Sequence, residues 1–419
     1  MHVIVIGAGI IGMTTAYYLK KKGHKVSIID AGEGPGLATS KANGAQLSYS
    51  FVAPLADPAV LPKLPSWLLG RNSPLSFRLR ADPAQWRWSM AFLSACRYSK
   101  SQRTTAELLQ LGLRSRELMH DLVAREDLSF DFKSSGKLLV YQDPVSYAAA
   151  LLQVDYQATL GCEQTALDRQ ACLDLEPALE DMYSRIAGGI FTRTEDAGDC
   201  MQLCSELERV LRSGPAAVEF QFNTSVKGFR KAAGEIVCLD TAAGDLQGDA
   251  YVIANGIGAQ ALARQANINP LIYPLKGYSL TYELTAASSA PAVSVSDVHN
   301  KVVYARLGNR LRVAGMVDIG DTTGAVNPAR IAALEHEARA YFPRMNPAAP
   351  AIAWAGLRPA RPDGKPLIGA TPYRNLWINA GHGALGFTLA TGSAALLADQ
   401  MSGVKAEHSE RVFGLGSFN

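Results

Sequence analysis

The sequence has few cysteines, and their spacing matches neither a disulfide framework nor a metal site. The six cysteines among 419 residues include no C-x-x-C pair, the spacing that is typical of structural zinc sites. Cys200 and Cys204 are four residues apart, which places them on one face of a predicted helix, but no pair of histidines accompanies them. We therefore expect reduced, packed cysteines in a reducing compartment and no bound metal.

Two further absences exclude other classes of protein. The net charge is only +3, so the chain as a whole is not expected to bind nucleic acid. No apolar stretch is long enough to span a bilayer, and the apolar run at the N-terminus lacks the basic leader of a signal peptide. We therefore expect a cytoplasmic protein, and 419 residues of which 48% are apolar are enough for two domains.

The first thirty residues have the pattern of a dinucleotide-binding βαβ unit. An apolar strand over 3–6 precedes a glycine turn and a helix, and a second apolar strand ends at Asp30, eighteen residues after Gly12. The glycines let the backbone approach a pyrophosphate, and the carboxylate can accept hydrogen bonds from ribose hydroxyls. The alternative is a glycine turn that binds no ligand. The predicted cofactor contacts are Gly7, Ala8, Gly9, Ile10, Ile11, Gly12 and Asp30.

A loop follows this unit, and its small and polar residues suit backbone contacts with a cofactor. The predicted contacts in the loop are Thr39, Ser40, Asn43, Gly44, Ala45 and Gln46.

The rest of the chain predicts an α/β protein of two interleaved parts. A Rossmann-like cofactor domain with a parallel sheet would comprise 1–50, 189–265 and 362–419. An α+β substrate domain with an antiparallel sheet would comprise 51–188 and 266–361. A cleft between two such parts is the default binding site. Apolar periodicity predicts helical structure over 84–127, and strands are expected over 189–192 and 218–226 among others.

The segment 51–100 is more basic than the rest of the chain. It carries seven basic and two acidic residues, a net charge of +5, interleaved with Trp67, Trp86, Trp88, Met90 and Leu93. Such a composition is typical of a segment that lies on an anionic membrane surface. The alternative is a proline-broken loop and a helix that cover the core, with solvated arginines.

A second glycine motif follows the expected strand 376–380. Gly381 to Gly386 has the G-x-G-x-x-G spacing, and a helix is expected from Phe387 onward. Too little chain follows for another strand and acid, so we reject a separate NAD site. A helix N-terminus aimed at the same cofactor would stabilise negative charge. A flavin gains such charge on reduction, so the first motif is predicted to bind FAD.

Arg358 lies in a proline-rich turn at the predicted domain junction. Its planar guanidinium matches a substrate carboxylate bidentately. The alternative is a structural arginine that pairs with Asp363.

Together these motifs resemble the flavin amine oxidoreductases of the D-amino-acid oxidase and glycine oxidase type. More narrowly, they are similar to the bacterial FAD-dependent D-amino acid dehydrogenases of small-subunit type. The resemblance runs nearly the whole length in the same order. It is carried by Gly7 to Gly12 with Asp30, by Thr39, Ser40, Asn43, Gly44 and Gln46, by Tyr273 to Ser279, by Gly356 to Gly364, and by Asn379 to Thr388.

The resemblance implies non-covalent FAD, oxidation of D-amino acids to 2-oxo acids and ammonia, and electron delivery to a membrane quinone rather than O2. It also implies peripheral attachment to the inner face of the membrane. Arg358 would bind the substrate carboxylate, Tyr278 and Tyr304 would assist it or shape the pocket, and His382 would lie near the flavin. The further cofactor contacts that it implies are Ala31, Leu47, Val226, Asn255, Gly256, Arg358, Gly381, Gly383, Leu385, Gly386, Phe387 and Thr388.

Three alternatives stay open at this point. The first is an oxidase or dehydrogenase of secondary or cyclic amines, such as sarcosine, glycine, D-proline or D-hydroxyproline. The second is a flavoprotein that binds a cofactor and a partner without amine chemistry. The third, an NAD-dependent dehydrogenase, is disfavoured by the C-terminal helix.

Overall fold

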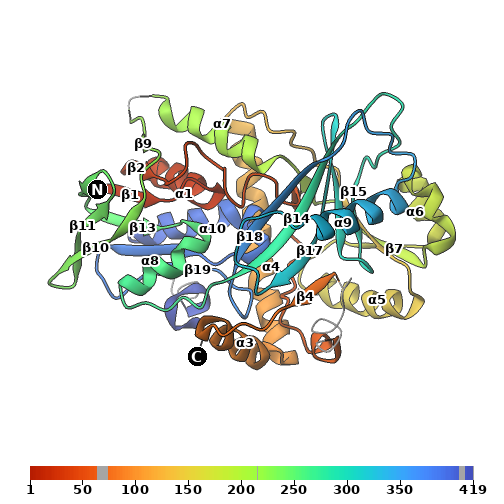
Figure 1. Ribbon diagram of the computed structural model, residues 1–419, viewed down its shortest axis with the longest axis horizontal. Helices are drawn as coiled ribbons and strands as arrows, with labels where there is room; N and C mark the ends of the chain where they lie inside the picture. Colours follow the sequence, from red (N-terminus) through yellow and green to blue (C-terminus); the bar gives the residue numbers. More distant parts are fainter. Residues whose placement is uncertain (64–73, 215, 405–410, 419) are drawn as a thin grey trace.

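The computed structural model describes residues 1–63, 74–214, 216–404 and 411–418. Two large β-sheets lie side by side along the long axis of the molecule (Figure 1), and the N-terminus begins the first of them. Part of the predicted membrane segment, including Trp67, lies outside the described residues.

The first sheet has six strands and contains the predicted dinucleotide-binding unit. Its strands, in spatial order, are β19 (Leu367–Ala370), β20 (Leu376–Ala380), β13 (Ala250–Ile253), β1 (His2–Ile6), β2 (Lys25–Ile29) and β9 (Glu219–Gln221). All neighbours are parallel except β19 and β20. Because side chains alternate along a strand, Val3 and Val5 face one core layer while Ile4 and Ile6 face the other. The predicted Rossmann-like sheet is confirmed.

Both faces of this sheet are covered. One face carries α1 (Ile10–Lys21), α7 (Cys200–Arg212) and α10 (Gly386–Met401). The other carries α8 (Ala259–Gln265) and a small antiparallel sheet of β10 (Val226–Ala232), β11 (Glu235–Thr241) and β12 (Gly244–Leu246). Asp199 caps α7, because its carboxylate accepts hydrogen bonds from the N–H groups of Met201 and Gln202.

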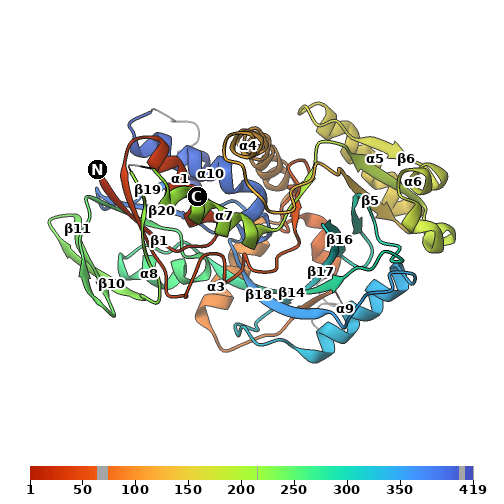
Figure 2. The same cartoon turned by 90° about the horizontal axis from the view of Figure 1, so that it is seen from above.

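The second sheet has nine strands. In order they are β18 (Ile352–Ala360), β14 (Tyr273–Glu283), β17 (Arg310–Ile319), β16 (Val302–Leu307), β15 (Ser294–Asp297), β5 (Lys137–Tyr141), β7 (Gly188–Thr192) and β6 (Thr165–Leu167), with β4 (Leu75–Phe77) beside β17. The helix α9 (Pro328–Tyr341) covers one face of β14 and β17. The helices α5 (Pro144–Ala158) and α6 (Arg169–Leu175) lie near β5, β6 and β7 (Figure 2).

The region 84–127, predicted to be helical, forms two helices rather than one. The first, α3 (Pro83–Ala95), ends before Cys96, and the second, α4 (Tyr98–Arg125), begins after Arg97. The two helices serve different cores: Trp88 of α3 packs near β14, whereas α4 packs against α10. The chain has to change direction between them. Within the described residues, no helix combines the length and apolar character needed to cross a bilayer.

Two assignments of strands also need correction. The strand β7 belongs to the nine-stranded sheet, where it pairs with β5 and β6, so 189–192 do not belong to the cofactor domain. The strand expected over 218–226 is split between β9 and β10 in different sheets, because Asn223 adopts a positive φ of 54° and breaks the extended backbone. The remaining domain boundaries stay predictions.

Short elements complete the fold. The strands β3 (Gln46–Leu47) and β8 (Asp196–Ala197) pair in an antiparallel ribbon, which joins the loop after β2 to the segment before α7. The 3₁₀ turns are η1 (Pro58–Lys63), η2 (Pro177–Arg185), η3 (Gly256–Gly258), η4 (Gly383–Leu385) and η5 (Leu415–Phe418).

Candidate active site

The glycine turn at the end of β1 is shaped by close backbone packing. Gly7 has a φ of 113°, and a Cβ atom there would lie 2.7 Å from the carbonyl oxygen of Ala254. A Cβ atom on Gly12 would lie 1.8 Å from the carbonyl oxygen of Gly7, so this glycine lets α1 approach the strand. Gly9 differs, because the nearest atom to its Cβ position is Ser40 Oγ at 3.6 Å. Packing within the protein therefore does not explain the glycine at position 9, whereas a pyrophosphate that approaches the backbone there would explain it.

Asp30 holds this turn in place. Its Oδ2 accepts a hydrogen bond of 2.7 Å from the N–H of Ala8, and its Oδ1 accepts one of 2.7 Å from Gly32. An ionised carboxylate has further lone pairs, so Asp30 can still accept hydrogen bonds from ribose hydroxyls. Ala31, beside it, is exposed.

The loop over 39–47 lies between the start of α1 and the nine-stranded sheet. Ser40 Oγ accepts a hydrogen bond from the N–H of Ile10 at 3.1 Å, and Thr39 Oγ1 donates to the carbonyl of Leu357 on β18 at 2.8 Å. Ser279 of β14 donates to the carbonyl of Ala42. A Cβ atom on Gly44 would lie 3.3 Å from Val303, so this glycine allows the loop to pack closely on the sheet.

The second glycine motif also ends at a helix N-terminus. The turn η4 leads into α10, whose first turn is capped by no side chain of the described residues, whereas Ser40 Oγ accepts the N–H of Ile10 in α1. Thr14 of α1 donates to the carbonyl of Ala390 on α10 at 3.2 Å, so the two helices are in contact. Both N-termini carry partial positive charge, and that of α10 also presents free N–H groups. The buried Oδ1 of Asn255, at the neighbouring end of β13, has no hydrogen-bond partner among the residues that the structure describes. This arrangement fits a dinucleotide cofactor.

His382 is buried behind this turn. Its Nε2 lies 3.1 Å from Ser393 Oγ, and burial lowers the pKa of the imidazole to about 3. His382 is therefore neutral at physiological pH and does not act there as an acid. Val226 lies at the start of β10 and packs against the six-stranded sheet. Gly256 begins η3, the turn that follows β13 of that sheet.

Arg358 is the most unusual charged residue near this loop. It stands opposite Leu275 in the pairing of β14 and β18, and its guanidinium lies over Gly277, where a Cβ atom would come within 2.4 Å of it. Residues of β14 on this face approach the loop, as the hydrogen bond of Ser279 shows. Arg358 therefore faces the cofactor loop.

The guanidinium of Arg358 has one weak hydrogen bond, to the carbonyl of Met316 at 3.4 Å. No carboxylate of the described residues forms an ion pair with it, so the alternative of a partnership with Asp363 is wrong; Asp363 instead accepts a hydrogen bond from the N–H of Lys365. Although part of its surface is accessible, burial lowers the pKa of Arg358 to about 10. A buried cation without a partner is costly, which makes it a binding site for an anion.

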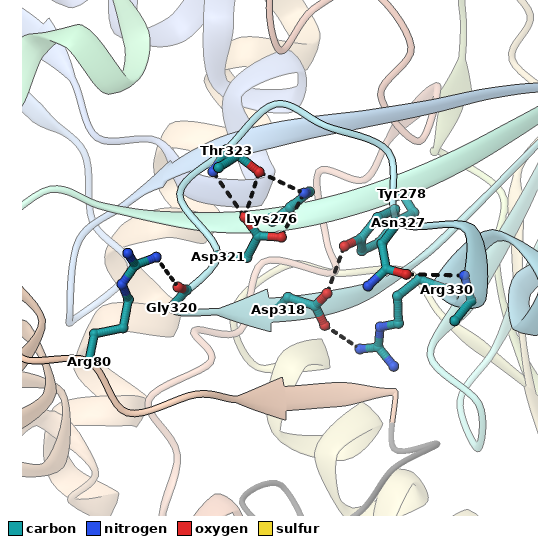
Figure 3. Close-up of polar contacts among 10 residues, drawn as sticks. Arg80, Lys276, Tyr278, Asp318, Gly320, Asp321, Thr323, Asn327 and Arg330 are labelled. Carbon is teal, nitrogen blue, oxygen red and sulfur yellow. Dashed lines mark hydrogen bonds and ion pairs between the residues drawn. The ribbon is translucent and has the colours of Figure 1, made fainter.

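Tyr278 and Tyr304 lie on the opposite face of the sheet, so the expectation that they assist Arg358 is wrong. Tyr278 donates a hydrogen bond of 2.7 Å to Asp318, and Asp318 accepts another from Arg330 of α9 at 2.5 Å (Figure 3). Burial, and then the bond to Asp318, raises the pKa of Tyr278. Tyr304 is fully buried and stacks on Tyr341 with ring centroids 5.1 Å apart. Both tyrosines are core residues under α9.

The same face holds the buried Lys276. It donates to Asp321 Oδ2 at 2.8 Å, and Asp321 also accepts hydrogen bonds from Thr323 (Figure 3). Burial alone would raise the pKa of Asp321, but these bonds lower it to about 2. Arg80 donates to the carbonyl of Gly320 nearby. This network joins β14, β17 and the following loop on the side away from the cofactor loop.

Two residues near the loop escaped the sequence analysis. Arg312 is buried on β17 and donates to the carbonyl of Asn43 at 2.8 Å. Met316 has a φ of 59°, rare for a residue other than glycine, at the bulge where β17 slips against β14. An arginine inside the apolar strand 310–319 is the signal that could have identified Arg312. The bulge has no such signal.

Other site types are not supported. Among residues 1–63, 74–214, 216–404 and 411–418, no group of three or more His, Cys, Asp or Glu side chains is arranged to hold a metal ion. All six cysteines are free and buried, as the sequence predicts.

Comparisons with known proteins agree with this geometry. Residues 2–400 match the family model described as FAD dependent oxidoreductase. The chain is 46% identical over 408 residues to "D-amino acid dehydrogenase 2" of Ralstonia nicotianae, covering 95% of this chain and 96% of the relative. It is 44% identical over 405 residues to "D-amino acid dehydrogenase 2" of Pseudomonas aeruginosa, covering 96% of this chain and 94% of that protein.

The fold is similar to that of a solved glycine oxidase from Geobacillus kaustophilus. The TM-score is 0.78 at 21% sequence identity, covering 99% of this chain and 97% of that chain. The interleaved sheets, the glycine turn with Asp30 and the match over almost the whole chain together give its family: the protein belongs to the FAD-dependent oxidoreductases.

Proposed function

We propose that this protein oxidises D-amino acids to 2-oxo acids and ammonia. The observation that carries the proposal is Arg358, a half-buried guanidinium without a carboxylate partner among the described residues, on the face toward the cofactor loop. The names of the relatives from Ralstonia and Pseudomonas support a D-amino acid as the substrate.

In this proposal the chain supplies binding and orientation rather than acid–base chemistry. The fork of Arg358 binds the substrate carboxylate bidentately and thereby turns the Cα–H bond toward the cofactor. FAD, when bound, supplies the acceptor for the hydride that leaves Cα. The uncapped N-terminus of α10 stabilises the negative charge that develops there. The imino acid is released into water and hydrolyses. Positioning supplies most of the rate enhancement.

The test is an anaerobic spectrum of the purified protein before and after addition of D-alanine, with L-alanine as the matched control. We expect the flavin absorbance to bleach with D-alanine and not with L-alanine. Bleaching by sarcosine, glycine or D-proline in place of D-alanine would instead support the secondary-amine alternative. A flavin that no amine bleaches would contradict the proposal.

We further propose that the protein works on the cytoplasmic face of the membrane and passes electrons to a quinone. The helix α3 supports this proposal, since it is apolar on two sides. Trp88 and Phe92 are buried, whereas Trp86, Met90 and Leu93 are 48%, 62% and 47% exposed. Their spacing of four and three residues places them along one outer face of the helix.

Exposed basic residues flank this outer face in the sequence. Four positions next to it in sequence, Arg80, Arg87, Arg97 and Lys100, are exposed. Exposed apolar residues flanked by arginine and lysine favour an anionic lipid surface over a neutral one. In Figure 1, α3 lies at the lower edge of the molecule, away from the six-stranded sheet.

Sedimentation with lipid vesicles tests this contact. A triple variant in which serine replaces Trp86, Met90 and Leu93 is expected to bind vesicles with anionic lipid at least about tenfold more weakly. Each of these apolar side chains would otherwise be buried in the lipid and contribute to the free energy of binding. The matched control is Val145→Ser with Leu152→Ser on α5, which are 77% and 73% exposed but lack basic neighbours on that helix. Equal binding by both variants, or equal binding to neutral vesicles, would contradict the proposal.

A further inference from the structure

Two directly opposed glycines lie in the sheet beside Arg358. Gly277 of β14 stands opposite Gly356 of β18, and the backbone does not require glycine at either position, since neither residue has a positive φ. Space is the requirement instead. A Cβ atom on Gly277 would overlap the guanidinium of Arg358, and a Cβ atom on Gly356 would overlap the far end of the indole ring of Trp354. The two glycines therefore let these two side chains lie close against the strands.

The side chains of Trp354 and Arg358 lie on the same face of the sheet. Along β18 they alternate with Ala355, which packs in the core under α9. Trp354 itself stands opposite Ser279, whose hydroxyl donates a hydrogen bond of 2.7 Å to the carbonyl of Ala42 in the cofactor loop. The indole therefore lies on the side of the sheet that faces the cofactor loop, as the guanidinium of Arg358 does.

Trp354 does not contribute to an apolar core. It is half-buried, and it belongs to none of the apolar clusters that the described residues form. Trp88 of α3 shows the contrast, because it is 2% exposed and stacks on Phe92 with ring centroids 5.2 Å apart. An indole that is held over a glycine beside the guanidinium, outside the core, offers a rigid apolar surface to a ligand.

The spacing of the two side chains suits a single amino acid. Directly opposed residues of an antiparallel pair have Cα atoms about 4.5–5.5 Å apart, and Arg358 and Trp354 each cover one residue of such a pair. A carboxylate that binds the guanidinium therefore brings the carbon atoms attached to it toward the indole. The side chain of an amino acid begins two bonds from its carboxylate carbon, so it is the group that this neighbourhood receives.

We propose that Trp354 contacts the substrate side chain and gives the site a preference for D-amino acids whose side chain is apolar. The inference rests on the proposed function, because it takes Arg358 as the anchor of the substrate carboxylate. The indole favours the transfer of methylene groups out of water, and it supplies no counter-charge for an acidic or basic side chain. Trp354 is thus a specificity-determining residue, and Gly356 is the residue that admits its ring.

The experiment measures the binding of two carboxylic acids to the FAD-loaded protein from the change in flavin absorbance. Propanoate and 4-methylpentanoate share the carboxylate that Arg358 would bind, and they differ in the length of the apolar tail. We expect Trp354→Ala to weaken the binding of 4-methylpentanoate about tenfold and that of propanoate less than about threefold, because only the longer tail loses contacts with the ring. The ratio of kcat/KM for D-leucine to that for D-alanine should fall by a similar factor.

The two glycines supply a matched pair of variants. Gly356→Ala should push the indole away and reproduce the selective loss of 4-methylpentanoate, whereas Gly277→Ala should displace the guanidinium and weaken the binding of both acids at least about tenfold. Trp354→Phe keeps a smaller ring and should lie between the wild type and Trp354→Ala, which tests the role without emptying the position. Ile352→Ala, on the same strand at a residue that is 67% exposed, is the control and should bind both acids as the wild type does.

Equal losses for the two acids in Trp354→Ala and Trp354→Phe would overturn the inference, because a structural defect affects both acids alike. A wild-type protein that binds neither acid would overturn it as well. A weaker affinity for FAD in these variants would also do so, since the indole would then contact the cofactor rather than the ligand. Absence of bleaching by D-alanine in the wild type would overturn the proposed oxidation itself. That failure is distinguishable, because the binding of the two acids requires no reaction.

Discussion

Replacing Arg358 with methionine is expected to lower kcat/KM for amino-acid substrates by about 10²–10⁴-fold. Truncating one partner of a buried, hydrogen-bonded charge pair costs about 3–5 kcal/mol, and each 1.4 kcal/mol is a factor of ten. The fold should survive the change, because the guanidinium has one hydrogen bond of 3.4 Å and no carboxylate partner among the described residues. Burial lowers the pKa of Arg358 to about 10, so its positive charge destabilises the folded protein when no anion is bound. Thermal stability should therefore stay equal or rise.

The measurements are steady-state kinetics and thermal unfolding of the same preparations. Arg330→Met is the matched control, because Arg330 is also buried but pairs with Asp318 on the face covered by α9. It should lose stability by about 3–5 kcal/mol, since the change leaves a buried carboxylate without this partner, and it should keep the wild-type KM. Arg358→Lys should recover only part of the activity, because an ammonium group lacks the bidentate fork. A wild-type KM in Arg358→Met would contradict the role of this residue.

Local pattern predicted the strand–turn–helix–strand unit at the N-terminus correctly, whereas its contacts with the cofactor stay predictions. The turn from Gly7 to Gly12, the second strand and Asp30 are adjacent in sequence, and each has a conformational requirement that the residue type reveals. The capping of α7 by Asp199 is equally local, because a helix cap depends on the next three residues only. The loop at 39–47 packs closely on the sheet at Gly44, and its contacts with the cofactor stay predictions.

Long-range packing decided what the sequence could not predict. Tyr278 and Arg358 lie on opposite faces of the sheet, and a face is set by the pairing register, which in this region includes a bulge at Met316. The break between α3 and α4 arises because the two helices pack on different cores. The sheet that β7 joins depends on residues about fifty positions away in β5. None of these leaves a local pattern.

Buried ionisable residues such as Lys137 form a third class. A lysine at the start of an apolar strand reads as the exposed end of that strand, because lysine is rarely buried. Ser48, whose hydroxyl oxygen accepts the hydrogen bond of Lys137, is 89 positions away in the sequence. The burial of this lysine becomes visible only when the two segments are placed together.

Gly9→Ala is expected to abolish tight FAD binding while leaving the folded protein intact. Gly9 has a φ of −72° and a ψ of 175°, which alanine adopts readily, and its Cβ position meets nothing closer than Ser40 Oγ at 3.6 Å. The new methyl group would instead occupy the space into which the pyrophosphate has to come. We expect the Kd for FAD to rise by at least about 10²-fold, the loss of about 3 kcal/mol.

Gly12→Ala should instead lower the stability of the apo protein more than it lowers the affinity for FAD. Its Cβ atom would lie 1.8 Å from the carbonyl oxygen of Gly7, so α1 has to move away from β1, and overpacking of this kind costs about 1–3 kcal/mol or more. Thermal unfolding of the apo proteins and titration with FAD separate the two effects. Gly23→Ala is the control, because Gly23 has a φ of 84° but open space around it, so it should lose only about 1 kcal/mol and keep its affinity for FAD. A Gly9→Ala protein that binds FAD normally would show that the cofactor does not approach this turn. A stable Gly12→Ala protein would show that α1 does not depend on this close contact with Gly7.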